Sequence, residues 1–195
     1  DPDPAAIANP RPLRSTTPLP ARVVLCFFPD VLAERVRDGR LAQVARFSRE
    51  LGATPVHVTT DRAEPVAVLH PGVGAPLAAI HLEQLIASGV TNVVACGGAG
   101  AVVPLPLGDV VVATSAVRDE GTSHHYLPPS REVTLDERLA ALAATVLREH
   151  GVPHRTGKVW TTDAPFRETR AKVERRRAEG CVVVESRNRV NESTT

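Results

Sequence analysis

The sequence predicts an α/β protein of three layers (α, β, α), in which a central mixed β-sheet carries helices on both faces. Two observations lead to this prediction. Short apolar runs typical of buried strands alternate along the 195 residues with longer segments whose apolar residues recur at helical spacing. Glycine or proline stands near the ends of many of these segments. Strands that alternate with helices generally form a sheet covered by those helices.

Seven segments are predicted to be strands. In each one, apolar and β-branched residues predominate, which is typical of strands buried in a sheet. The predicted strands are residues 22–28, 55–60, 65–70, 92–96, 108–118, 158–162 and 181–185. The first 20 residues are rich in proline and lack apolar periodicity, which predicts an extended or disordered arm.

The first two helices are predicted from apolar spacing and from their ends. Apolar residues from Val31 onward recur at helical spacing, with a break at residues 38–39, and the pattern ends at Gly52. In the second helix, Pro76 suits the first turn and Gly89 suits the position just past the end.

The third and fourth helices follow in the second half of the chain. Thr134 and Glu137 have the spacing of a capping box, and Gly151 stands where the third helix would end. One face of that helix is predicted to be apolar, with Leu135, Leu139, Leu142 and Val146. The fourth helix is predicted at 168–180, and its basic residues alternate with acidic ones, so we expect them to face solvent.

Composition excludes several classes of function. A hydrophobic content of 43% and a charged content of 23% are ordinary for a globular protein, and a net charge of +1 offers no basic surface for nucleic acid or membrane. No apolar run approaches the ~20 residues that span a bilayer, and no signal peptide is recognisable, so a cytoplasmic location is expected. The chain lacks methionine and starts at Asp1, which predicts a processed or fragmentary product.

One main domain is expected at 21–186, between the arm and a flexible polar tail at 187–195.

Three cysteines each lie within an apolar, strand-like run. Their odd number and the absence of CxxC spacing argue against a disulfide framework and against a zinc site. We therefore expect buried, reduced thiols at Cys26, Cys96 and Cys181.

A polar cluster follows the strand predicted at 108–118 and is a candidate functional site. Arg118 ends the strand, and two acidic residues and the pair His124-His125 come next. In open α/β sheets, ligands bind in the loops that follow strands. Adjacent histidines in an extended chain point to opposite sides, and no further ligand stands at a metal-binding spacing, so no metal is expected.

Two further segments have residues suited to ligand binding. The glycine-rich bend Gly97–Gly100 follows a strand, and its backbone N–H groups could face an anion; the alternative is a simple tight turn. After the strand at 158–162, Phe166 offers a ring for stacking on a flat heterocycle, while Arg167 and Glu168 offer a donor and an acceptor. Here the alternative is a turn that leads into the next helix.

Together these segments resemble the nucleoside phosphorylase family, which comprises purine nucleoside and uridine phosphorylases and related nucleosidases. The segment "NVVACGGAGAV" is similar to the family's strand and G-T-x-G bend, and "GDVVVATSAVRDEGTSHHY" to the following strand and loop. "TTDAPFRET" resembles the base-binding S-x-D-x-F segment, and "EGCVVVE" leads toward the Glu-Met-Glu motif. The resemblance covers Arg22–Glu185 and implies a phosphorylase/hydrolase-like fold.

The resemblance also implies an activity, namely cleavage of a nucleoside's N-glycosidic bond with phosphate as the co-substrate and with no cofactor. It implies a homo-oligomer, because in the family a neighbouring subunit contributes to each pocket. The residues implied to bind substrate are Gly97, Gly98, Gly100, Arg118, Phe166 and Glu168. The residues implied to be catalytic are Asp163, Arg167 and Glu185.

The chain departs from the family pattern at several of these positions. Ala95 stands where the phosphorylases carry a phosphate-binding arginine, and Gly98 replaces the threonine of the bend. Ser186 and Arg187 stand where the methionine and second glutamate belong, and the chain ends before the family's terminal helix. These departures leave two alternatives open: a nucleosidase that uses water, and a catalytically impaired member that binds nucleoside or assembles with partners. They also predict weak activity for a truncated or altered product.

Overall fold

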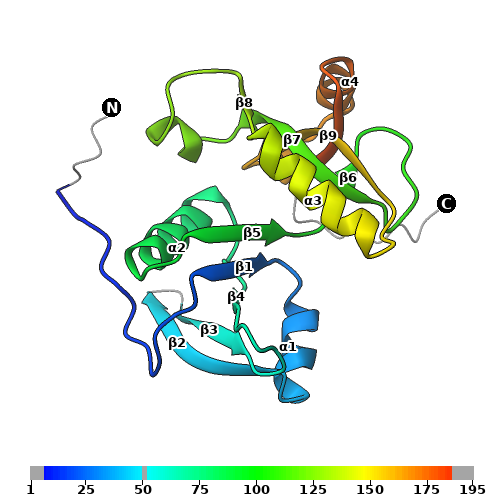
Figure 1. Ribbon diagram of the computed structural model, residues 1–195. Helices are drawn as coiled ribbons and strands as arrows, with labels where there is room; N and C mark the ends of the chain where they lie inside the picture. Colours follow the sequence, from blue (N-terminus) through cyan, green and yellow to red (C-terminus); the bar gives the residue numbers. More distant parts are fainter. Residues whose placement is uncertain (1–6, 50–51, 186–195) are drawn as a thin grey trace. The chain divides into compact units, whose positions relative to one another are not determined.

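The computed structural model describes residues 7–49 and 52–185. Contacts between Cα atoms divide the chain into two compact units, which meet in sequence between Gly98 and Ala99. We call them the N-terminal unit and the C-terminal unit. Each contains one five-stranded sheet with both parallel and antiparallel strands, together with helices (Figure 1). The α/β class with mixed strand directions is confirmed, and the single sheet of the prediction is resolved into two.

In the N-terminal unit the strand order is β2-β3-β4-β1-β5. Strand β1 (Arg22–Cys26) lies between β4 (Ala67–Leu69) and β5 (Asn92–Cys96) and is parallel to both. The antiparallel pair β2 (Leu41–Arg49) and β3 (Gly52–Thr59) extends the sheet beyond β4. Because β1 has neighbours on both sides, its apolar run is buried as the sequence predicted.

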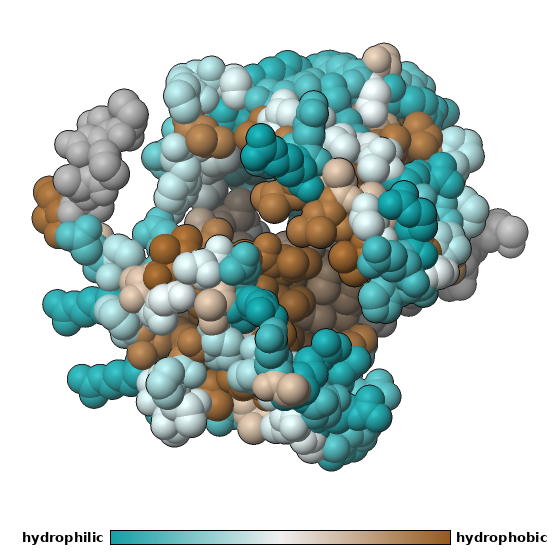
Figure 2. Space-filling model, in the orientation of Figure 1, coloured by the Kyte–Doolittle hydropathy of each residue, from teal (hydrophilic) through white to brown (hydrophobic). Residues whose placement is uncertain are grey.

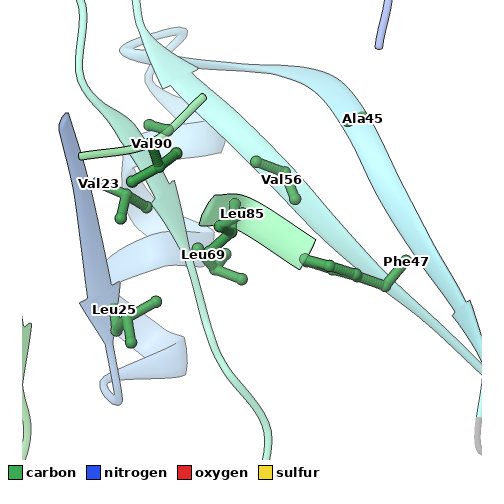
Figure 3. Packing of buried hydrophobic residues seen from close by; sticks show 9 residues of the cluster. Val23, Leu25, Ala45, Phe47, Val56, Leu69, Leu85 and Val90 are labelled. Carbon is green, nitrogen blue, oxygen red and sulfur yellow. The ribbon is translucent and has the colours of Figure 1, made fainter. Parts of the chain in front are cut away.

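Helices α1 (Pro29–Arg37) and α2 (Ala75–Ala87) belong to the same unit, and each begins with proline in its first turn. Leu85 of α2 packs into the core with side chains from the sheet (Figure 3). The buried residues of this core are Val23, Leu25, Ala45, Phe47, Val56, Ala67, Leu69, Leu85 and Val90. The core therefore holds α2 against the sheet that carries the Gly97–Gly98 bend at the end of β5.

One prediction in this unit is wrong, because residues 41–49 form strand β2 and do not continue a helix. Gly39 adopts a φ of 71°, which lets the chain leave α1 and turn back. A register shift between Gln43 and Ala45 marks a β-bulge. Leu41 before the bulge packs with Cys26 and Leu32, whereas Ala45 and Phe47 after it pack into the other core of this unit. The apolar residues that seemed to recur at helical spacing therefore belong to a bulged strand.

In the C-terminal unit the strand order is β6-β10-β9-β7-β8. The three central strands, β7 (Val110–Asp119), β9 (His154–Thr162) and β10 (Cys181–Glu185), are parallel. Strands β6 (Gly100–Ala101) and β8 (Glu132–Thr134) flank them in the antiparallel direction. The core of this unit consists of Val102, Val117, Trp160, Cys181 and Val184.

Helix α3 (Glu137–Glu149) forms where predicted, but its N-cap differs from the prediction. Asp136 is the N-cap, and its side chain accepts a hydrogen bond from the Arg138 N–H at 2.8 Å. Thr134 cannot form the predicted capping box because it ends strand β8. The apolar face of α3 is exposed to a considerable degree, at 43–65% for Leu139, Leu142 and Val146, and Figure 2 shows apolar surface along this helix. Leu135, predicted to lie on the same face, precedes the helix and is 39% exposed.

Helix α4 (Arg170–Ala178) forms within the predicted range, and the Thr169 side chain caps it.

Of the predicted arm, residues 7–20 are described, and they run extended along the N-terminal unit. The Leu13 N–H donates to the Ser88 hydroxyl at 2.9 Å, and Leu13 and Leu19 pack against the core. Apolar anchors thus hold this proline-rich segment. The predicted tail at 187–195 lies outside the described residues.

Candidate functional site

Most of the predicted site residues of the C-terminal unit lie at, or directly after, the carboxyl ends of its three parallel strands. Arg118 of β7 and Glu185 of β10 are both in register with Thr161 of β9. Residues 163–168 come directly after β9. Because the three strands run in the same direction, these residues gather at one edge of the sheet, which is where α/β proteins bind their ligands.

A hydrogen bond joins the loops that follow β7 and β9. The Gly121 N–H donates to the Asp163 carboxylate at 3.0 Å. The first loop includes a short 3-10 helix at Thr122–His125, and the second includes another at Pro165–Arg167. Through this contact Asp163 can hold the two loops together. Its predicted catalytic role stays a prediction.

The Arg118 guanidinium is bound within the loop that follows its own strand. It donates to the Ser123 hydroxyl at 2.8 Å, to the Pro128 carbonyl at 2.8 Å and to the Ser130 hydroxyl at 2.7 Å. The residue is only 8% exposed. With these donors engaged, the contacts of Arg118 hold the loop in shape, and its predicted role in substrate binding stays a prediction.

The loop after β9 presents an aromatic ring next to two charged residues. Phe166 is 87% exposed, an unusual position for a large apolar ring, and Arg167 is exposed beside it. The Oε1 atom of Glu168 is buried and has no hydrogen-bond partner among the residues that the structure describes. A ring available for stacking beside an unsatisfied acceptor suits a flat heterocycle that carries an N–H group.

A network of charged groups connects β7 and β9 with helix α4. The Asp119 carboxylate accepts hydrogen bonds from the Trp160 indole at 3.1 Å, from Lys172 at 3.1 Å and from Arg176 at 3.0 Å. Arg176 also donates to Glu179 at 3.0 Å, and its guanidinium carbon lies 5.3 Å from the centre of the Trp160 ring. Through Lys172 and Arg176 the network holds α4 against the ends of β7 and β9, and this restrains the loop between β9 and the helix.

Two opposing effects act on the pKa of Asp119. Burial alone would raise it, but the hydrogen bonds from Arg176, Lys172 and Trp160 together lower it below its ordinary value. Burial likewise acts to raise the pKa of Glu120, and the hydrogen bonds from Ser123 outweigh that effect and lower it. Both acids are therefore held as carboxylates at neutral pH.

Sequence reasoning missed this network. The basic residues of the fourth helix were expected to face solvent, but the Arg176 side chain is only 3% exposed. The available signal was a lone tryptophan near the end of a strand, with an acid at the end of another and arginine and lysine four residues apart on a helix. Only the register of β7 and β9 brings Asp119 and Trp160 together.

The glycine-rich bend belongs partly to each unit. In the N-terminal unit, Gly97 and Gly98 follow β5, and a Cβ on Gly97 would lie 3.1 Å from the Phe27 Cβ. Gly97 therefore allows a close approach between two loops. A Cβ on Gly98 would find its nearest neighbour, on Phe28, at 3.8 Å, an ordinary contact. Gly100 pairs with Val184 in the C-terminal unit.

Other kinds of site find little support in the described residues. Within residues 7–49 and 52–185, no group of three or more His, Cys, Asp and Glu side chains is placed to hold a metal ion. His124 and His125 are both exposed on their short helix. No helix in the described ranges combines the length and the hydropathy of a bilayer-spanning segment.

Comparison with known proteins agrees with the resemblance that the sequence motifs implied. Uridine phosphorylase of Thermococcus kodakarensis is 30% identical over 109 residues, which are 55% of this chain and 39% of that protein. Uridine phosphorylase of Treponema pallidum is 32% identical over 131 residues, which are 65% of this chain and 51% of that protein. The chain thus spans about half the length of these relatives, or less.

The fold is shared with a solved structure and with a whole family. The crystal structure of uridine phosphorylase from Vibrio fischeri ES114 matches 92% of this chain and 76% of that chain, with a TM-score of 0.74 and 24% identity. At that identity the likeness shows the fold alone. The family model described as the phosphorylase superfamily matches residues 21–186, which is most of the chain. The chain therefore belongs to the phosphorylase superfamily.

Proposed function

We propose that this protein cleaves the N-glycosidic bond of a nucleoside by phosphorolysis, as a pentosyltransferase. The observation that carries the proposal is the family match over residues 21–186, together with relatives that are named uridine phosphorylases. In this reaction the bond between C1′ of the sugar and the base breaks, and a phosphate oxygen bonds to C1′. The departing base takes up a proton. Phosphate is the co-substrate, and no cofactor takes part.

The proposal assigns the base to the loop after β9. The exposed ring of Phe166 would stack on the base, Arg167 would donate to it, and the buried Oε1 of Glu168 would accept from an N–H group. Asp163 would act by holding this loop through Gly121. Glu185, at the end of β10, would contact the sugar.

The proposal assigns the phosphate to the bend after β5. Gly97 and Gly98 follow the end of β5 and carry no side chain, so their backbone N–H groups can approach an anion. Gly100, which pairs with Val184 of β10, would line the sugar. Such groups stabilise the transition state by position and by electrostatics, because the reaction needs an anion held beneath the sugar.

One observation favours hydrolysis as a second candidate. Ala95 stands where the resemblance places the phosphate-binding arginine of the phosphorylases, and a nucleosidase that uses water needs no such group. A catalytically impaired nucleoside-binding member is the third possibility, because Ser186 and Arg187 replace the expected methionine and glutamate.

A single assay separates these candidates. The chain is incubated with a panel of purine and pyrimidine nucleosides, with and without inorganic phosphate, and free base is measured. Release that requires phosphate supports phosphorolysis, release without phosphate supports hydrolysis, and binding without release supports the third candidate. Gly98→Val is compared with the wild-type chain in the same assay. We expect the variant to fold, because a Cβ at this position would have its nearest neighbour at 3.8 Å. We expect its release of base to be no longer stimulated by phosphate.

The proposal includes a homo-oligomer and a cytoplasmic location, with no nucleic-acid or membrane partner. The exposed apolar residues of α3 support self-association, because apolar patches often form subunit interfaces. Three free cysteines support the cytoplasm, because oxidising compartments favour disulfides. Light scattering at micromolar concentration measures the oligomeric state, and a monomer that retains activity would contradict the first of these two proposals.

A further inference from the structure

Two cysteines face each other at the ends of adjacent strands in the N-terminal unit. Cys26 is the last residue of β1 and Cys96 is the last residue of β5, and the two are in direct register in a parallel pair. The Cys26 thiol donates to the Phe28 carbonyl at 4.0 Å, and it lies close enough to Cys96 to act on the pKa of that thiol. Cys26 is buried, whereas Cys96 is exposed, so the expectation of a buried thiol at position 96 is wrong.

The placement suits a disulfide bond. Neighbouring strands lie about 4.8 Å apart, which falls within the range of Cα separations of about 4.4–6.8 Å found for disulfides. In-register residues of parallel strands project to the same face of the sheet. Both cysteines are also terminal in their strands, so the chain beyond them can adjust to bring the two sulfur atoms into bonding distance.

We propose that Cys26 and Cys96 are a dithiol pair that closes to an intramolecular disulfide on reaction with a low-molecular-weight disulfide. The Cys96 thiolate attacks one sulfur of the reagent, and the first small thiol leaves. The Cys26 thiolate then attacks Sγ of Cys96 and displaces the second small thiol. The protein loses two protons and two electrons, and one reagent molecule is reduced to two thiols. This inference goes beyond the proposed nucleoside chemistry and does not depend on it.

The exposed and buried members of the pair have different parts in this sequence of steps. Cys96 is accessible to a reagent, whereas Cys26 is only 6% exposed and is reached from Cys96. Although the residue is exposed in part, the surrounding chain partly desolvates the Cys96 thiol, and this desolvation, followed by the neighbouring Cys26 thiol, raises the pKa of Cys96 to about 11. Only the thiolate is the nucleophile, so the first step is slow at neutral pH. Its rate should rise about tenfold per pH unit below pH 11.

The bond would lie directly beside the glycine bend. Gly97 follows Cys96 and packs against Phe27, which follows Cys26, and the Phe27 N–H donates to the Cys96 carbonyl at 2.9 Å. A covalent link one residue before this contact would tie the two loops together. Oxidation and reduction of the pair therefore alter the restraint on the bend to which we assign phosphate.

The test uses the whole chain, incubated natively with oxidised glutathione, quenched with acid and analysed by mass spectrometry. We expect the loss of two hydrogens and a peptide that links residues 26 and 96, with Cys181 still free. A reductant should reverse the change. In Cys96→Ser no intramolecular bond should form, and in Cys26→Ser glutathione should remain attached to Cys96. Because Cys96 is exposed, Cys96→Ser should fold.

Two results would overturn the proposal. In the first, the wild-type chain would accumulate glutathione on Cys96 and retain a free Cys26 thiol. In the second, a non-reducing gel would show chains linked to one another through Cys96. Repeating the incubation at pH 7, 8 and 9 measures the rate of the first step. A rate that did not rise with pH would contradict attack by the Cys96 thiolate.

Discussion

The strand ends of the two units are built from different chemistry. In the C-terminal unit, charged side chains such as Asp119, Arg176 and Arg118 tie the loops and α4 to the sheet. In the N-terminal unit, the bend after β5 is shaped by close packing of Gly97 on Phe27 and by a pair of thiols. The first arrangement should respond to changes of charge and pH, and the second to changes of side-chain volume and oxidation.

The largest effect is expected from breaking the charged network. Arg176→Ala removes a guanidinium that is 3% exposed and leaves the carboxylates of Asp119 and Glu179 with fewer partners. We expect the free energy of unfolding to fall by about 3 kcal/mol, as for a buried ion pair that loses one member. Urea denaturation measures it. The control is Arg175→Ala, because Arg175 is exposed and the change in net charge is the same.

The next largest effect tests the packing of the bend. Gly97→Ala would place a Cβ 3.1 Å from the Phe27 Cβ, and we expect overpacking to lower the free energy of unfolding by about 2 kcal/mol. Gly98→Ala is the control, because its nearest neighbour would be 3.8 Å away. Equal stability of the two variants, measured by thermal and urea denaturation, would show that the Phe27 contact does not limit this position.

A smaller effect should follow the protonation of Asp119. Its pKa is lowered in the folded state, so its stabilising contribution is complete above the unfolded value of about 3.9 and is lost as the pH falls through the folded value. Asp119→Asn should therefore be less stable than wild type by about 1 kcal/mol at pH 6. That difference should shrink below pH 4. Urea denaturation at several pH values measures it, and a difference independent of pH would argue against a role for the charge.

The smallest effect is expected at the link between the two loops of the C-terminal unit. Asp163→Ala removes the acceptor for the Gly121 N–H, and because the contact is exposed, the loss of stability should be about 0.5 kcal/mol. Asp163→Asn keeps an acceptor oxygen and serves as the control. If the loop binds the base as proposed, Asp163→Ala should also raise KM for the nucleoside more than it lowers kcat. Identical KM values for both variants and wild type would show that the contact between Asp163 and Gly121 does not contribute to substrate binding.

The strands were predictable where burial leaves a continuous apolar run. Residues 22–28 and 181–185 contain β1 and β10, which have neighbours on both sides and carry apolar residues at consecutive positions. Strand β2 was not predictable in this way, because its bulge near Gln43 breaks the two-residue alternation. The capping residue of α3 was misassigned because Thr134 and Asp136 both suit an N-cap, and pairing with β7 takes Thr134 into a strand.

Along the chain, local pattern was sufficient to determine the α/β class and the order of most elements. It also identified the polar residues that follow β7 and β9, because side-chain periodicity and glycine or proline at segment ends act over a few residues. Only the tertiary structure decided which residues meet. Asp163 and Gly121 are 42 residues apart, Arg176 and Asp119 are 57 apart, and Cys96 faces Cys26 across a strand pair. Such contacts depend on the register between strands, which no short stretch of sequence specifies.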